Sequence, residues 1–228
     1  MLSSRACLAF PIVILVFFAP SHTPARTASD TESLLKNMEG AYAQVKDYQT
    51  DIEVKTYSGD GSFAIQKFLY TFKKPDRIRL DFQTPHSGLV LVYPDQNGKA
   101  VLRPPGLGRF FTLHLAPGNS LLRMSSGQRI DQTDLGLLIK NIGHSLTDRR
   151  RGPAEFAEDD GNTRVRVLAD DHFQKGVETL YQFLIDNKLR LPAEVEESTP
   201  EGRLERKIIF HNLRINTGVP DSFFRMDG

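Results

Sequence analysis

The side chains that could carry chemistry are few and scattered along this 228-residue chain. Six histidines stand singly, and one of them closes the run Asp170-Asp171-His172, whose groups are common metal ligands. This run falls in a polar turn between two expected strands, so we favour a solvated loop over a metal site. The carboxylate pairs Asp159-Asp160 and Glu196-Glu197 lie in turns or at strand ends, and we expect both pairs to be solvated. We therefore predict no metal and no cofactor.

The common catalytic motifs are absent from the sequence. There is no G-x-S-x-G elbow, phosphate-binding P-loop, H-E-x-x-H pair or G-x-G-x-x-G fingerprint. The densest charge cluster is Arg149-Arg150-Arg151, which is either a solvated loop or a contact for lipid phosphates or an acidic partner. No nucleophile stands beside a base, so we predict that the protein is not an enzyme. A hydrolase acting on an apolar substrate is the alternative of that class.

Composition narrows the class of protein further. Lys and Arg total 29 against 28 Asp and Glu, a formal net charge of +1, so no excess of positive charge points to nucleic acid. A single cysteine excludes an internal disulfide framework and a multi-cysteine zinc site. With 39% hydrophobic and 25% charged residues the chain has the balance of a globular protein, and it shows no internal repeat or linker.

The first residues have the pattern of an export signal. Arg5 precedes an apolar run, Ala6–Ala19, whose roughly 14 residues are too few to span a bilayer as a helix. Small residues suited to signal peptidase follow. Cys7 precedes the apolar run, so it is not the lipid-modified cysteine that would follow such a run. We predict a cleaved signal peptide at residues 1–25, a domain at 29–228, and the periplasm as its location; an uncleaved membrane anchor is the alternative.

Two segments have helical periodicity. Ser29-Asp30-Thr31-Glu32 has the spacing of a capping box and opens an apolar stripe that ends at Val45. The second helix is expected between Asp131 and Leu146, with Thr133 or Asp134 as its cap. Gly136 and Gly143 should weaken that helix by about 1 kcal/mol each relative to alanine, so we expect it to be able to move.

The remainder alternates with a period of two residues and predicts about eleven short strands. Hairpin-length connections require antiparallel neighbours, so the fold class is mainly β (α+β), with one curved antiparallel sheet. A sheet of this size curls, and the two apolar helices must cover its concave side. Such a covered, apolar concavity is either a container for an apolar ligand or a solid core.

Two runs of sequence resemble the LolA-like outer-membrane lipoprotein carrier family. The first run extends from Phe72-Lys73-Lys74-Pro75-Asp76 to Phe82, followed by Pro85, Leu91-Val92 and Asn97-Gly98-Lys99. The second comprises the closing strands and Gly218-Val219-Pro220-Asp221-Ser222-Phe223-Phe224, which is similar to the family's ending, N-x-G-[LV]-x-D-x-x-F. The chain departs from the family in its missing tryptophans, in the region from Arg103 to Arg129, and at Lys74, where the family has a lid-contacting arginine.

The resemblance implies an unclosed eleven-stranded β-barrel whose helices form a lid over an acyl-binding cavity. It also implies a monomer that carries an acylated lipoprotein or lipid between an inner-membrane loading complex and an outer-membrane receptor, with no nucleic-acid partner. Lys74 is then the candidate lid latch, donating hydrogen bonds to carbonyl groups at the edge of the lid when the cavity is empty. The candidate cavity residues are Ile52, Val54, Phe68, Tyr70, Phe72, Ile78, Leu80, Phe82, Leu91, Leu113, Leu138 and Ile142.

We thus predict a periplasmic carrier that holds acyl chains in an apolar cavity and shuttles lipoproteins or lipids towards the outer membrane. The alternative is a sensing, receptor or interaction domain of the same fold, which reads lipoproteins without transporting them.

Overall fold

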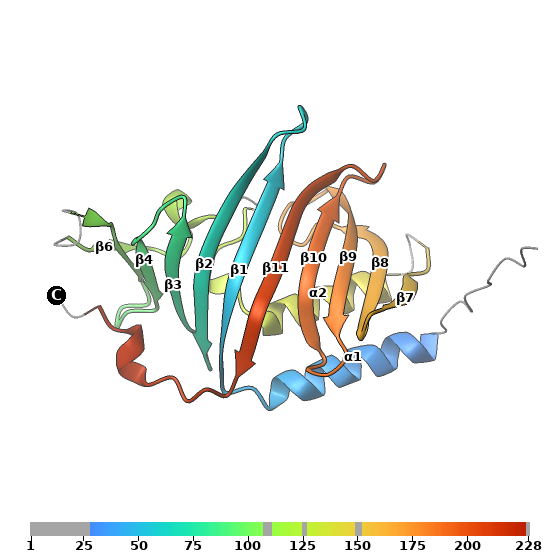
Figure 1. Ribbon diagram of the computed structural model, residues 1–228, viewed down its shortest axis with the longest axis horizontal. Coiled ribbons are helices and arrows are strands. Elements are labelled where there is room, and N and C mark those ends of the chain that lie inside the picture. Colours follow the sequence, from blue (N-terminus) through green and yellow to red (C-terminus); the bar gives the residue numbers. More distant parts are fainter. Residues whose placement is uncertain (1–27, 107–110, 125–126, 149–151, 227–228) are drawn as a thin grey trace, which may run out of the picture.

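The computed structural model describes residues 28–106, 111–124, 127–148 and 152–226 (Figure 1). The predicted signal peptide and the arginine run at 149–151 lie outside these ranges. Two α-helices are present in them, α1 (Ala28–Ala43) and α2 (Leu135–Thr147), together with short 3-10 turns, among them η2 (Ser120–Leu122), η3 (Ile130–Gln132) and η5 (Asp221–Phe224). The strands are β1 (Asp47–Tyr57), β2 (Phe63–Lys73), β3 (Arg77–Thr84), β4 (Val90–Tyr93), β5 (Ala100–Arg103), β6 (Leu113–Leu115), β7 (Glu155–Asp159), β8 (Asn162–Asp170), β9 (Glu178–Asp186), β10 (Leu191–Ser198) and β11 (Leu204–Ile215).

The described strands form one antiparallel sheet in the order β6-β5-β4-β3-β2-β1-β11-β10-β9-β8-β7. Its centre is the pairing of the first strand with the last, in which Ile52 lies opposite Phe210 and Val54 opposite Ile208. All other neighbours are consecutive in sequence, as short hairpin connections require. β6 and β7 do not pair with each other, so the sheet stays open. The predicted unclosed, eleven-stranded antiparallel sheet with two helices is confirmed.

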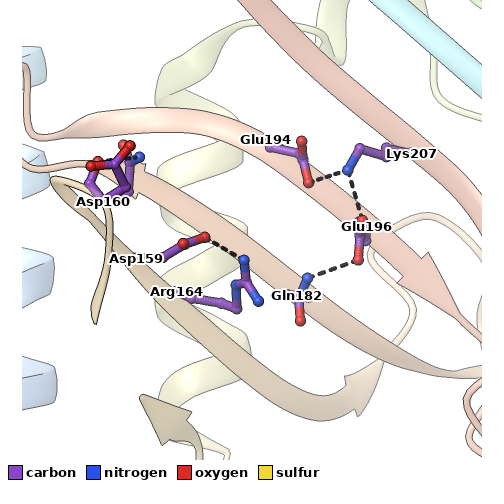
Figure 2. Close-up of polar contacts among 8 residues, drawn as sticks. Asp159, Asp160, Arg164, Gln182, Glu194, Glu196 and Lys207 are labelled. Carbon is purple, nitrogen blue, oxygen red and sulfur yellow. Dashed lines mark hydrogen bonds and ion pairs between the residues drawn. The ribbon is translucent and has the colours of Figure 1, made fainter. Parts of the chain in front are cut away.

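The two faces of the sheet differ in polarity because side chains alternate along each strand. On β9, Thr179, Tyr181, Phe183 and Ile185 are buried on the concave face. The opposite face carries a ladder of polar contacts across β9, β10 and β11 (Figure 2). Its members are Gln182, whose Nε2 lies 2.8 Å from Glu196, and Lys207, whose Nζ lies 2.9 Å from Glu196 and 2.6 Å from Glu194. The concave face of the sheet is therefore mainly apolar, and the opposite face is polar.

The helices cover the concave face. In Figure 1, α1 runs along one end of the strands and α2 lies behind the centre of the sheet. α1 packs against α2, and α2 against β8 and β10. Leu135, Ile139 and Ile142 of α2 are at most 3% exposed, and Met38 of α1 is fully buried. Within the described residues, no helix is long and apolar enough to cross a membrane.

The cap of α2 is the one expected from sequence. The Asp134 side chain accepts hydrogen bonds from the backbone N–H groups of Gly136 (2.7 Å) and Leu137 (3.1 Å). An N-cap carboxylate satisfies donors that have no partner inside the helix. By contrast Ser29, the expected cap of α1, lies inside this helix.

The segment after β11 is tied to the start of β1 by a buried carboxylate. Asp47 is 4% exposed, and its Oδ1 accepts hydrogen bonds from Thr217 N (2.7 Å), Thr217 Oγ1 (2.9 Å) and Gly218 N (3.1 Å). Gly218 has a φ of 75°, a left-handed conformation that favours glycine. Asn216 adds a second tie, because its Oδ1 accepts from Lys46 N at 2.7 Å.

The same segment then crosses the outer face of the sheet and ends in η5. Asp221 forms ion pairs with Lys73 (2.6 Å) and Arg77 (3.1 Å), and Phe224 packs with Val92 in a second small apolar cluster. The residues of the N-x-G-[LV]-x-D-x-x-F ending thus hold the end of the chain onto β1–β4.

We predict that Asp47→Ala lowers the free energy of unfolding by about 2–3 kcal/mol, because the hydrogen bonds from Thr217 and Gly218 to a buried carboxylate are lost. Urea denaturation measures the change. Asp51→Ala on the outer face is the control, since Asp51 accepts only a 3.3 Å bond from exposed Asn212, and its effect should stay within about 0.5 kcal/mol. Equal effects of the two substitutions would contradict the anchoring role of Asp47.

Candidate functional site

A cavity of about 90 Å³ lies between the concave face of the sheet and the segment that leads into α2. Four strands, β1, β2, β10 and β11, supply its floor. The lining side chains are Ile52, Val54, Gln66, Phe68, Tyr70, Met124, Gln128, Thr133, Asp134, Leu138, Asn141, His172, Phe173, Val195, Glu197, Arg206, Ile208 and Phe210. Most of the floor is aliphatic or aromatic, which makes the cavity suited to an apolar chain.

The residues expected at an acyl site fall into three groups. Those that line the cavity are Ile52, Val54, Phe68, Tyr70 and Leu138. Those that pack in or against the main core away from this cavity are Phe72, Ile78, Leu80, Phe82, Leu91 and Ile142. Leu113 does neither: it is 44% exposed on β6, which is an edge strand of the sheet. Alternation along a strand predicts on which face of the sheet a side chain lies. Whether that side chain lines the cavity or is packed in the core depends on the curvature of the sheet.

One end of the cavity is charged. Arg206 of β11 lies opposite Glu197 of β10, its Nη2 donates a hydrogen bond to Glu197 Oε2, and each residue is only 8% exposed. Our expectation that Glu196 and Glu197 are both solvated is therefore wrong for Glu197. Successive residues of a strand point to opposite faces, so Glu196 joins the outer ladder while Glu197 follows buried Val195 into the concavity.

Burial changes the protonation of this pair. Removal from water raises the pKa of Glu197 to about 7, against the opposing attraction of Arg206. Arg206 is incompletely satisfied, because its Nε is buried and has no hydrogen-bond partner among the described residues. A buried guanidinium donor without an acceptor is unusual in a folded protein.

His172 forms another part of the polar wall. Its ring stacks on Tyr181 with centroids 4.2 Å apart, and its Nε2 lies 2.8 Å from Ser145 Oγ of α2. Burial lowers the pKa of His172 to about 4, so the ring is neutral at pH 7. Asp171 instead caps its own turn by accepting from Phe173 N at 2.8 Å. Within the run that we expected to be a solvated loop, Asp170 is exposed whereas Asp171 and His172 are half-buried. No cluster of three potential metal ligands occurs in the described part of the chain.

Three tyrosines hold the start of α2. The hydroxyl of Tyr42 donates to Asp134 Oδ1 at 3.0 Å, and that of Tyr48 accepts from Leu135 N at 3.0 Å. The hydroxyl of Tyr70 shares a 3.0 Å hydrogen bond with Thr133 Oγ1. Burial raises the pKa of all three tyrosines, most clearly that of fully buried Tyr48. These residues come from α1, β1 and β2, so the N-terminus of α2 is attached to both the other helix and the sheet.

Lys74 contacts the C-terminal end of α1, where Tyr42 lies. Its Nζ donates to the carbonyl groups of Tyr42 (2.8 Å) and Ala43 (3.3 Å), at the C-terminal end of α1, and sits 4.5 Å from the Tyr42 ring centre. In the structure Lys74 reaches α2 only through Tyr42, which it holds beside Asp134.

The two glycines of α2 have different surroundings. A Cβ added to Gly143 would meet Leu35 at 3.7 Å, an ordinary contact. A Cβ added to Gly136 would lie 2.8 Å from Tyr42 Cζ and closer still to Cε1, which is too near for either ring atom. Our expectation that both glycines simply loosen the helix is therefore corrected for Gly136, whose missing side chain lets Tyr42 reach Asp134.

A wider groove of about 780 Å³ lies on the other side of the sheet, between the β3–β5 region and the C-terminal segment. It includes the Asp95–His114 contact at 2.8 Å and the charged residues Arg77 and Asp221. Because this groove is open and charged, the smaller concave cavity is the better site for an apolar chain.

No family model matches the sequence, and no curated protein is similar to it. Solved structures do match in fold. An uncharacterized conserved protein from Thermus thermophilus aligns with a TM-score of 0.51 at 7% identity, over 87% of this chain and 94% of that one. MucB aligns at 0.48 and 12% identity, over 88% of this chain and 64% of its own. A LolA superfamily protein from Nitrosomonas europaea aligns at 0.40 and 11% identity, over 86% and 97%.

At these identities the likeness concerns the fold alone. The observed architecture is itself the one that the sequence resemblance implied: an unclosed antiparallel half-barrel with helices over its concave face. The chain therefore shares its fold with the Thermus thermophilus protein, and its architecture agrees with the one that the resemblance to the LolA-like family implies.

We predict opposite effects for two alanine substitutions in α2. Gly143→Ala should raise the free energy of unfolding by about 1 kcal/mol through helix propensity. Gly136→Ala should lower it by about 1–3 kcal/mol, because the new methyl group displaces Tyr42. Amide hydrogen exchange in α2 should slow in the first variant and quicken in the second. If both variants slow exchange, the contact between Gly136 and Tyr42 is not a constraint.

Proposed function

We propose that this protein is a non-enzymatic carrier of the periplasm that holds the acyl chain of a lipid or lipoprotein and delivers it towards the outer membrane. The observation that carries the proposal is the covered concave face, where Ile52, Val54, Phe68, Ile208 and Phe210 surround a cavity. Residues 1–25, with their short apolar run, support export. On the outer face behind this site, side chains of β9, β10 and β11 form a ladder of polar contacts instead (Figure 2).

The cavity must enlarge to hold an acyl chain. Its volume of about 90 Å³ compares with about 300–1,000 Å³ for typical ligand sites. Leu138 of α2 and Met124 of the preceding segment project into the cavity, so their withdrawal enlarges it. In this proposal α2 and the acyl chain compete for the same apolar face, which gives a closed form and an open, loaded form.

Lys74 is proposed to favour the closed form. It orders the end of α1 and places Tyr42 beside Asp134. The closed position of α2 therefore depends on two contacts, from Lys74 to Tyr42 and from Tyr42 to Asp134. A few hydrogen bonds at the end of one helix are a small barrier, since each contributes about 0.5–1.5 kcal/mol. Release of cargo therefore needs only a modest difference in affinity between the two forms.

We predict that Ile208→Glu weakens binding of a fluorescent C16 probe with a neutral headgroup at least tenfold, because a carboxylate in the apolar floor is costly to bury. Ile209→Glu is the matched control: the neighbouring residue is of the same type, is also partly buried, and points to the outer face of β11. Its Kd should stay within twofold of the wild type. Equal loss in both variants, or no binding by the wild type, would contradict the proposed site.

We predict that Lys74→Leu lowers the Kd of the same probe by about threefold to tenfold, since a weaker closed form competes less with the ligand. Lys67→Leu on the outer face, where Lys67 pairs with Glu53 at 2.6 Å, should leave the Kd unchanged. A weaker affinity of the Lys74 variant would show that Lys74 supports the loaded form instead. Transfer of the probe from loaded protein to acceptor vesicles then separates a carrier from a sensing or interaction domain, which would bind without transfer.

A further inference from the structure

The ion pair between Glu197 and Arg206 is out of place in an otherwise apolar floor. Neighbours on the same face include Val195 and Ile208, one on each strand. Burying a charged pair removes both groups from water, and such a pair is often no more stabilising than apolar residues of similar size. The stability of the sheet therefore gives no sufficient reason for charges at this position.

The hydrogen bonds of Arg206 are also incomplete. Its guanidinium presents five N–H donors in a plane, which suits two parallel bonds to one carboxylate. The structure shows Nη2 donating to Glu197 Oε2, while Nε is buried without an acceptor. A carboxylate placed against the edge of the guanidinium formed by Nε and Nη2 would satisfy both donors.

We propose that Arg206 binds the carboxylate of a long-chain fatty acid, whose chain lies on the apolar floor of the cavity, and that this carboxylate displaces Glu197. The inference rests on the proposed acyl-binding function and names the headgroup that the site selects. The ligand carboxylate takes a place beside Arg206 that a carboxylate of the chain already occupies, so the site needs no new chemistry. Val54, Phe68 and Phe210 supply the neighbouring apolar surface.

The charges around the pair are compatible with this exchange. Asp171, in the β8–β9 connection, repels the Glu197 carboxylate, as does Glu205 of β11, and Tyr181 of β9 is uncharged because its pKa is raised by burial. His172 is neutral, and Asp134 is engaged at the cap of α2. With its pKa near 7, Glu197 can accept a proton when the ligand takes its place, which leaves one negative charge beside Arg206.

The test compares two probes of equal chain length, palmitate and hexadecanol, by titration against the intact exported protein. In the wild type, palmitate should bind at least tenfold more tightly than hexadecanol. Glu197→Gln keeps a hydrogen-bonding side chain and frees the charge of Arg206, so palmitate affinity should rise at least threefold. The double variant Glu197→Gln/Arg206→Met leaves no unpaired charge, so it avoids the folding defect of a single substitution at Arg206.

In the double variant, palmitate affinity should fall to that of hexadecanol, and hexadecanol affinity should change less than twofold. The control is Glu196→Gln/Lys207→Met, a comparable ion pair on the same two strands but on the outer face (Figure 2), which should alter neither probe. Binding of hexadecanol with no preference for palmitate would overturn the inference and leave the acyl site intact. Equal losses of both probes in the double variant would show that the pair is structural. Binding of neither probe to the wild type would overturn the acyl-binding function itself, and the inference with it.

Discussion

The structure depends on one imbalance: a sheet with a large apolar face must be covered by two short helices. Alternation along the strands sends apolar side chains to the concave face and polar ladders to the other. Water is excluded from the concave face only where α1, α2 and the segment before α2 lie over it. α2 has 13 residues, so it covers the middle of the curve and not its edges. Exposed Leu113 on β6 marks the limit of that cover.

The position of α2 is set at its N-terminus. Buried Leu135, Ile139 and Ile142 give the helix an apolar side, yet packing of this kind permits sliding and tilting. Directional contacts remove that freedom: Tyr42, Tyr48 and Tyr70 reach the first residues of the helix and its cap. At the other end, the contact between Ser145 and His172 is the corresponding tie. In the proposed carrier, these few contacts at the two ends of α2 are the ones that must break when the helix moves away from the cavity.

The two ends of the cavity on the concave face differ in charge. The floor formed by β1 and β2 is mostly apolar, with Gln66 as an uncharged polar member, whereas the part formed by β10 and β11 contains Glu197 and Arg206. In the proposed function, an apolar molecule with one acidic end contacts both the apolar floor and Arg206. A purely apolar ligand would make no use of the ion pair between Glu197 and Arg206. Because the pKa of Glu197 is raised to about 7, the state of this pair is also sensitive to pH near neutrality.

Much of the fold could be predicted because its signals are local. Period two assigned the strands, turn residues marked the hairpins, and Asp134 caps α2 through its own neighbours in sequence. The apolar stripes of the two helices placed them over the concave side, and the family resemblance added the openness of the sheet. These features depend on residues a few positions apart, which a sequence displays directly.

The site itself was decided by contacts between distant residues. A side chain at position 136 would collide with Tyr42 of α1, and Lys74 donates hydrogen bonds to α1 and not to α2. Glu197 lies beside Arg206 because of the register between β10 and β11. Among the candidate cavity residues, the curvature of the sheet separated Ile52 and Phe68, which line the cavity, from Leu80, which is fully buried in the core. The sequence by itself determined the alternation of side chains along the strands and the approximate extent of most elements, although it placed neither Glu197 nor the start of α1 correctly. Only the tertiary structure decided which of these side chains are in contact. The register of the strands, the curvature of the sheet and the position of a helix all depend on packing over the whole domain.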